Sequence, residues 1–95
     1  MSTYLLEATE EKQLSDAEVL ALSAKSPKLF ERLVVKYQEE FLRKTKYILK
    51  NKEEAEDIVQ DAFVKMYLNA SKFKVQPDAS FKSWAYKILL NTCFT

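Results

Sequence analysis

The sequence predicts an all-α fold, a compact bundle of about four helices. The 95-residue chain has no glycine and only two prolines, whereas hairpins and tight turns depend on glycine. Apolar residues recur three and four positions apart over long stretches, which is the spacing of one helix face. Residues that suit helix N-caps stand before these stretches. A chain of this length forms one small domain.

The composition excludes several classes of protein. The chain has one cysteine, Cys93, and no histidine, which excludes a disulfide framework and histidine-based zinc sites or triads. Phosphate-binding loops built on glycine are excluded as well. We therefore expect no catalytic site, no metal and no cofactor, and Cys93 is expected to be a small core or near-surface residue. Without a signal peptide or an apolar run of about 20 residues, a cytoplasmic location is expected and no membrane contact.

The N-terminal part predicts a loose arm followed by a short helix. Residues 1–14 are polar and acidic with weak periodicity. Ser15 is a good N-cap and Glu18 completes a capping box, which predicts a helix over residues 15–25. Its inward face is expected to consist of Val19, Leu22 and Ser23, with Leu20 beside them.

A long helix is predicted next, ending near Lys50. Ser26 is the expected cap, and Pro27 suits the first helical position because its missing N–H costs nothing there. The apolar face is Phe30, Leu33, Val34, Tyr37, Phe41, Thr45 and Ile48. The outer face is basic, and a solvated surface is its simplest interpretation.

The third helix, predicted from Asn51 to about Ala70, carries two stripes. Asn51 is the expected cap, with Glu54 at the capping-box position. One stripe is apolar and should face the core: Ala55, Ile58, Val59, Ala62, Phe63, Met66, Tyr67 and Ala70. The other combines acidic, amide and aliphatic groups: Asp57, Gln60, Asp61, Val64 and Leu68. This second stripe is either a solvated face, since scattered exposed aliphatics are normal, or a docking surface for a basic partner.

A loop over residues 71–80 precedes the fourth helix. Gln76 precedes a proline and is disfavoured in helical geometry, and Phe73 is expected to close the end of the core. The helix begins after Ser80 and keeps its period to Thr95, which suggests that the parent protein continues. Its inward face is Phe81, Trp84, Ala85, Ile88, Leu89 and Thr92.

This C-terminal part also carries groups that suit nucleic acid. Lysines for phosphates alternate with aromatic residues for stacking and with polar side chains for base edges, a combination typical of single-strand recognition. The candidates are Lys72, Lys74, Lys82, Tyr86, Lys87 and Asn91. Four lysines do not establish such a site by themselves, and the period favours a core position for Trp84.

Two blocks of sequence resemble region 2 of bacterial sigma-70 family sigma factors, closest to the extracytoplasmic-function (ECF) group. The first block is Ala55–Phe63 (AEDIVQDAF), and the second is Ser80–Ile88 (SFKSWAYKI) followed by Asn91. The stretch from Leu29 to Ile48 resembles the long helix that precedes the first block. The resemblance covers residues 15–95.

The resemblance implies roles for these residues. The first block would dock on the coiled coil of the RNA polymerase β′ subunit through Asp57, Gln60, Asp61, Val64 and Leu68. Residues 72–80 would form a base-capturing loop, and Lys82, Tyr86, Lys87 and Asn91 would lie along the unpaired non-template strand of the promoter −10 element. An anti-sigma factor is a further implied partner, expected to cover the same docking face.

The sequence departs from the family in three respects. It ends at Thr95 without the basic residues that often follow the asparagine, it lacks a second domain (region 4) for the −35 element, and its loop has no glycine. We therefore expect a domain that binds polymerase better than it selects promoters. The alternatives are a helical interaction module, such as an adaptor or anti-activator, and a helix-turn-helix repressor fragment, which the ten-residue loop fits poorly.

Overall fold

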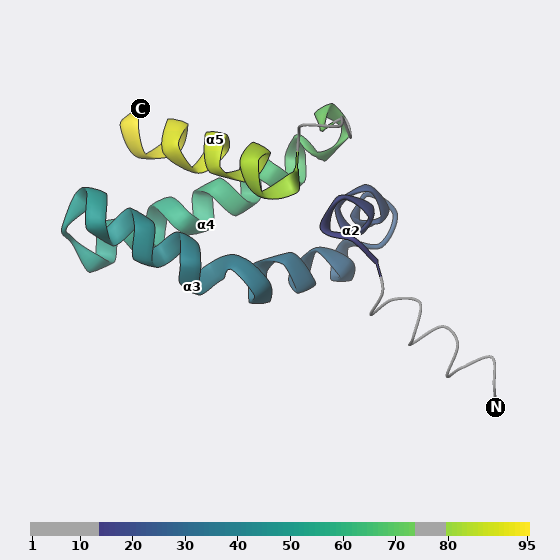
Figure 1. The fold of residues 1–95 in the computed structure, drawn as a ribbon, viewed down its shortest axis with the longest axis horizontal. Coiled ribbons are helices and arrows are strands. Elements are labelled where there is room, and N and C mark those ends of the chain that lie inside the picture. The colour runs from purple at the N-terminus through teal and green to yellow at the C-terminus, as the bar shows by residue number, and fades with distance from the viewer. Residues whose placement is uncertain (1–13, 74–79) are drawn as a thin grey trace.

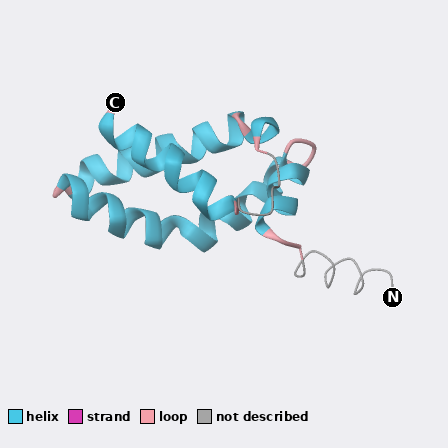
Figure 2. Ribbon diagram, turned by 45° about the horizontal axis from the view of Figure 1, so that its top comes forward, coloured by secondary structure: helices cyan, strands magenta, loops and turns pink. Residues whose placement is uncertain are grey.

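The computed structural model describes residues 14–73 and 80–95, and these residues form helices joined by short connections (Figure 1, Figure 2). The α-helices are α2 (Asp16–Ser23), α3 (Phe30–Leu49), α4 (Lys52–Leu68) and α5 (Phe81–Phe94), and the 3₁₀ turns are η1 (Pro27–Leu29) and η2 (Ala70–Lys72). No strand occurs in the described ranges, and the predicted all-α fold is confirmed. The predicted arm lies outside them, apart from Leu14.

The helices pack as a bundle in which α4 lies between α3 and α5. Helix α4 packs extensively against both neighbours, whereas α3 and α5 touch over a shorter length. Figure 1 shows α2 end-on at the N-terminal end of α3, so the short helix lies across the long ones. The last turn of α5 returns to the connection between α3 and α4, where Thr95 and Leu49 line one depression.

The core is built on aromatic side chains. Phe41 is fully buried, and its ring lies 5.3 Å from that of Tyr37, 5.5 Å from that of Phe63 and 5.1 Å from that of Tyr86, centroid to centroid. Leu33, Met66 and Leu89 are also fully enclosed. Each such side chain contributes about 1.5–3 kcal/mol by leaving water, so the apolar stripes of α3, α4 and α5 hold the bundle together.

The caps predicted at Ser15 and Asn51 are confirmed, and Ser80 caps the last helix as well. The Ser15 hydroxyl accepts from the Glu18 N–H at 3.1 Å, and the Glu18 carboxylate accepts from the Ser15 N–H at 2.9 Å, which completes the capping box. The Asn51 side chain accepts from the Glu54 N–H at 3.0 Å. The Ser80 hydroxyl accepts from a backbone N–H of the first turn of α5. The chain turns from α3 to α4 at Lys50, which takes the left-handed conformation (φ 57°) without a glycine.

The first helix differs from its prediction. It ends at Ser23, two residues early, because Ser26 precedes a proline and adopts a non-helical geometry (φ −132°, ψ 82°). Leu22 is 45% exposed, whereas Leu20 is buried together with Val19. A hydroxyl and an ammonium of α3 also hold α2 in place: Tyr37 donates to the Asp16 carboxylate, and Lys36 donates to it at 2.9 Å.

The start of α3 and the end of α4 also differ from the prediction. The side chain of Ser26 makes no capping bond, and Pro27 begins a 3₁₀ turn, so the α-helix starts only at Phe30. Helix α4 ends at Leu68, and Ala70 belongs to the following 3₁₀ turn. These shifts leave the predicted inward faces of α4 and α5 buried or half-buried.

Candidate functional site

The outer face of α4 carries the five residues predicted to dock a partner. Asp57, Gln60, Asp61, Val64 and Leu68 are all exposed. We call these five residues the docking face. The two aliphatic side chains are 54% (Val64) and 70% (Leu68) exposed. The opposite side of the helix is fixed by buried residues such as Ala55 and Met66, so the docking face is held towards solvent.

A groove between α3 and α4 borders the docking face. It encloses about 550 Å³ and is lined by Val34, Gln38, Leu42, Glu56, Asp57, Val59, Gln60, Phe63 and Val64. A second, shallower depression of about 420 Å³ shares Asp57, Gln60 and Val64 and adds Ile58 and Asp61. Sequence reasoning missed the contribution of α3. The four-residue spacing of Val34, Gln38 and Leu42 places them on one stripe, but the sequence does not tell which helix packs beside it.

The predicted DNA-binding residues are divided between two flanks of α5. Lys82 and Tyr86 face α3, where both contact Glu40. The Tyr86 hydroxyl donates to the Glu40 carboxylate at 2.6 Å, and the Lys82 ammonium lies 3.0 Å from it. Sequence reasoning missed Glu40, which no motif distinguishes from the neighbouring Glu39.

Both partners of this hydrogen bond have shifted pKa values. Burial, followed by the bond to Glu40, raises the pKa of Tyr86 to about 12. The hydrogen bonds from Tyr86 and then Lys82 lower the pKa of Glu40, and burial acts in the opposite direction. A carboxylate that accepts two bonds is stabilised in its charged form, so Glu40 is ionised near neutral pH.

On the other flank of α5, Lys72 and Asn91 border a pocket of about 370 Å³ between α4 and α5. The lining residues are Lys65, Asn69, Lys72, Trp84, Ile88, Asn91, Thr92 and Thr95. Lys65 donates to the Thr92 hydroxyl at 3.4 Å and forms an ion pair with Asp61 at 3.7 Å. The pocket thus combines ammonium groups, amides and an indole ring.

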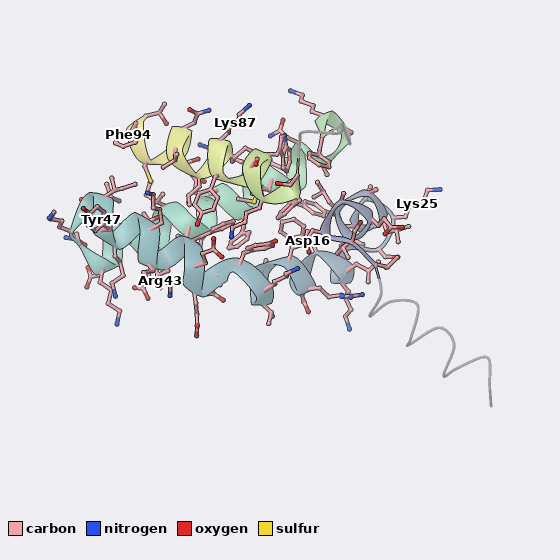
Figure 3. All side chains as sticks on the ribbon, viewed as in Figure 1. Asp16, Lys25, Arg43, Tyr47, Lys87 and Phe94 are labelled. Carbon is pink, nitrogen blue, oxygen red and sulfur yellow. The ribbon has the colours of Figure 1, made fainter. Side chains whose placement is uncertain are left out.

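Trp84 connects this pocket to the two ends of the loop that precedes α5. Its ring is half-buried and lies 5.2 Å from that of Phe73 and 6.1 Å from that of Phe81. Phe73 is half-buried against the core, as predicted. Lys87 is exposed and projects from α5 away from α3 (Figure 3). Lys74 and most of the predicted base-capturing loop lie outside the described residues.

The described ranges hold no cluster of three or more acidic, cysteine or histidine side chains that could bind a metal ion. Cys93 is half-buried and free, in line with the prediction of a near-surface residue. Within the same ranges, no helix combines the length and the apolar character needed to span a bilayer.

Comparison with known proteins identifies the class. Residues 33–95 match the family described as sigma-70 region 2. The RNA polymerase sigma-H factor of Pseudomonas aeruginosa is 36% identical over 63 residues, which cover 66% of this chain and 32% of that protein. The ECF RNA polymerase sigma factor SigM of Mycobacterium tuberculosis is 30% identical over 80 residues, covering 83% of this chain and 40% of the relative.

The chain therefore belongs to the sigma-70 region 2 family. Its relatives place it among sigma factors and include a member of the ECF group, as the sequence blocks suggested. Sigma factors are not enzymes, which agrees with the prediction from composition. The matched segments span about a third to two-fifths of the length of these relatives.

Proposed function

We propose that this region 2 domain acts in transcription initiation by docking on RNA polymerase through α4 and holding single-stranded promoter DNA on α5. The observation that carries the proposal is the docking face, which presents acidic and aliphatic groups side by side on a rigid helix. The expected partner is the coiled coil of the β′ subunit. An anti-sigma factor would cover the same face and compete with polymerase.

The chemistry of the docking face suits a basic helical partner. Asp57 and Asp61 offer carboxylates to lysine or arginine side chains, and such pairs select the partner and its orientation. Val64 and Leu68 are exposed apolar groups whose burial would contribute about 25 cal/mol per Å². The adjoining groove gives the side chains of a partner helix a place to insert between α3 and α4.

Calorimetry with a purified β′ coiled-coil fragment tests the docking. We expect the wild-type chain to bind at micromolar or tighter affinity, about −8 kcal/mol or better. The combined substitutions Gln60→Ala and Asp61→Arg should abolish binding while leaving the helical circular dichroism intact. Glu39→Arg is the matched control, since it makes the same charge change at an exposed position of α3. Equal binding by both variants would reject the docking face.

The flank of α5 that borders the α4–α5 pocket supports the second part of the proposal. Lys72 provides positive charge, Asn91 can bond to base edges, and the aromatic ring of Trp84 lines the same pocket. Stacking of one unpaired base on an aromatic ring is worth about 1–3 kcal/mol. Unpaired bases of the −10 non-template strand are therefore the expected ligand, with Lys87 following the backbone.

Binding of labelled single-stranded and duplex −10 oligonucleotides tests this part. We expect Lys87→Ala and Asn91→Ala to weaken binding to the single strand more than to the duplex. The effect of Lys87→Ala should fade as salt is added, because each phosphate contact releases counterions. Lys28→Ala, an exposed lysine in η1, serves as the control. Equal losses on both DNA forms would argue against capture of a strand.

A further inference from the structure

The carboxylate of Glu40 contacts Lys82 and Tyr86, two of the residues that the sequence predicts to bind DNA. Its carboxylate lies 3.0 Å from the Lys82 ammonium and accepts the Tyr86 hydroxyl bond at 2.6 Å. Both partners come from α5, whereas Glu40 comes from α3, 42 and 46 positions earlier in the chain. Glu40 thus links α3 to α5 through two polar side-chain contacts.

This arrangement conflicts with a simple role of Lys82 in strand binding. The negative charge of the paired carboxylate cancels much of the attraction that the ammonium would exert on a phosphate. Tyr86 is restricted in the same way: its ring packs edge-on against Phe41 at 5.1 Å and its hydroxyl is already bonded. Lys82 is nevertheless half exposed, so solvent and ligands reach the pair.

We propose that Glu40 masks Lys82 and Tyr86 in the free protein and that a DNA phosphate must displace its carboxylate to engage them. The inference rests on the proposed strand binding and adds a specificity-determining residue to it. A ligand that contacts only Lys82 gains little, because it must first break the internal pair. A strand that also occupies the opposite flank of α5 can offset that cost, so Glu40 disfavours non-specific polyanions.

The surroundings of Glu40 support this role. Bonds from Tyr86 and Lys82, together with the positive charge of Arg43, lower the pKa of Glu40 and keep it ionised near neutral pH. The contacts with Tyr86 and Lys82 hold its carboxylate in place, and its side chain is 30% exposed. Glu39 is exposed beside it and has no bond to α5 among the described contacts. The two glutamates therefore form a matched pair for experiment.

A double-mutant cycle on single-stranded DNA binding tests the inference. The affinity of the full chain for a short labelled single strand is measured by fluorescence anisotropy for Glu40→Gln, Lys82→Ala and the double variant. Glu40→Gln should raise the affinity about two- to fivefold, the range of a partly exposed ion pair. It should also steepen the dependence of log K on log salt by about 0.7, one added contact to a single strand.

The cycle distinguishes masking from a general charge effect. The gain from Glu40→Gln should disappear when Lys82 is replaced by alanine, and Glu39→Gln should give no comparable gain. A gain that persists without Lys82, an equal gain from Glu39→Gln, no gain, or weaker binding by Glu40→Gln would each overturn the inference while the proposed strand binding stands. If neither the wild type nor Glu40→Gln binds single strands, both proposals fall. Circular dichroism checks that each variant remains helical.

Discussion

Single side chains determine where the helices begin. The Asn51 side chain accepts a backbone N–H at the start of α4, whereas Ser26 stands before a 3₁₀ turn and makes no such bond. Asparagine and serine are both preferred at N-caps. Only the structure therefore shows that Asn51 forms the capping bond and that Ser26 does not.

Asn51→Ala should therefore destabilise the domain, and Ser26→Ala should not. The loss of the Asn51 cap is expected to cost about 1 kcal/mol of unfolding free energy. Ser26→Ala should stay within about 0.5 kcal/mol of the wild type, like other surface substitutions. Urea unfolding followed by circular dichroism measures both. A Ser26→Ala loss as large as that of Asn51→Ala would contradict the capping assignment.

The bond between Tyr86 and Glu40 predicts a pH dependence of stability. Because the pKa of Glu40 is lowered in the folded state, its contribution is present above the usual carboxyl pKa and is lost as pH falls through the lowered value. Because the pKa of Tyr86 is raised from 10.0 to about 12, its contribution is present below pH 10.0 and is lost as pH rises through about 12.

Tyr86→Phe measures this contribution, because phenylalanine keeps the ring and removes the hydroxyl. The wild type should exceed the variant by about 1 kcal/mol near neutral pH, and the difference should shrink in acid and in alkali. Tyr47→Phe, at a tyrosine that is 76% exposed, should show no such profile. A Tyr86→Phe difference that does not change with pH would contradict the assigned link between stability and the shifted pKa values of Tyr86 and Glu40.

Hydrogen bonds between residues close together in the sequence could be predicted, whereas those between distant residues could not. The caps at Ser15 and Asn51 involve partners three residues away, and the sequence predicted them. The bonds of Glu40 reach across more than forty residues, and no local pattern distinguishes it from Glu39.

At the scale of whole helices, α2 illustrates how a short element is held by few contacts. Leu20 is fully buried and Leu22 is 45% exposed, although both are leucines two positions apart. The predicted inward face included Leu22 because a helix of eight residues offers too few turns to fix its orientation by period alone. The bonds that Lys36 and Tyr37 of α3 donate to Asp16 set that orientation. Asp16 is labelled in Figure 3.

Leu20→Ala and Leu22→Ala should therefore have different effects. Removing the buried side chain of Leu20 is expected to cost about 2–5 kcal/mol, as for other core leucines. Leu22→Ala should change the unfolding free energy by about 0.5 kcal/mol or less. Denaturant unfolding of the two variants provides the comparison. Similar losses would contradict the orientation of α2 in which Leu20 faces the core and Leu22 faces solvent.

The long helices were predicted more accurately than their ends. Five turns of regular apolar spacing identify the buried side of α3, and the same holds for α4 and α5. The start of α3 was misplaced because Pro27 suits an α-helix and a 3₁₀ turn equally well at its first position. The groove between α3 and α4 could not be predicted, since it requires knowledge of which stripes are neighbours.

Considered as a whole, the molecule places its two proposed surfaces on adjoining sides of α4, linked by the ion pair between Asp61 and Lys65. The groove beside the docking face and the pocket between α4 and α5 share no lining residue. Lys87 projects from α5 away from α3 (Figure 3). A partner on α4 and a strand on the outer flank of α5 therefore have room to bind together.

The most direct test of the account is an NMR titration of the isotope-labelled chain with an unlabelled β′ coiled-coil fragment. We predict shifts of the backbone amides at Asp57, Gln60, Asp61, Val64 and Leu68, together with those at Val34, Gln38 and Leu42 across the groove. Lys87 and Asn91 should be unaffected. Shifts confined to α5, or none at all with a well-folded chain, would contradict the claim that this region 2 domain docks on polymerase through α4.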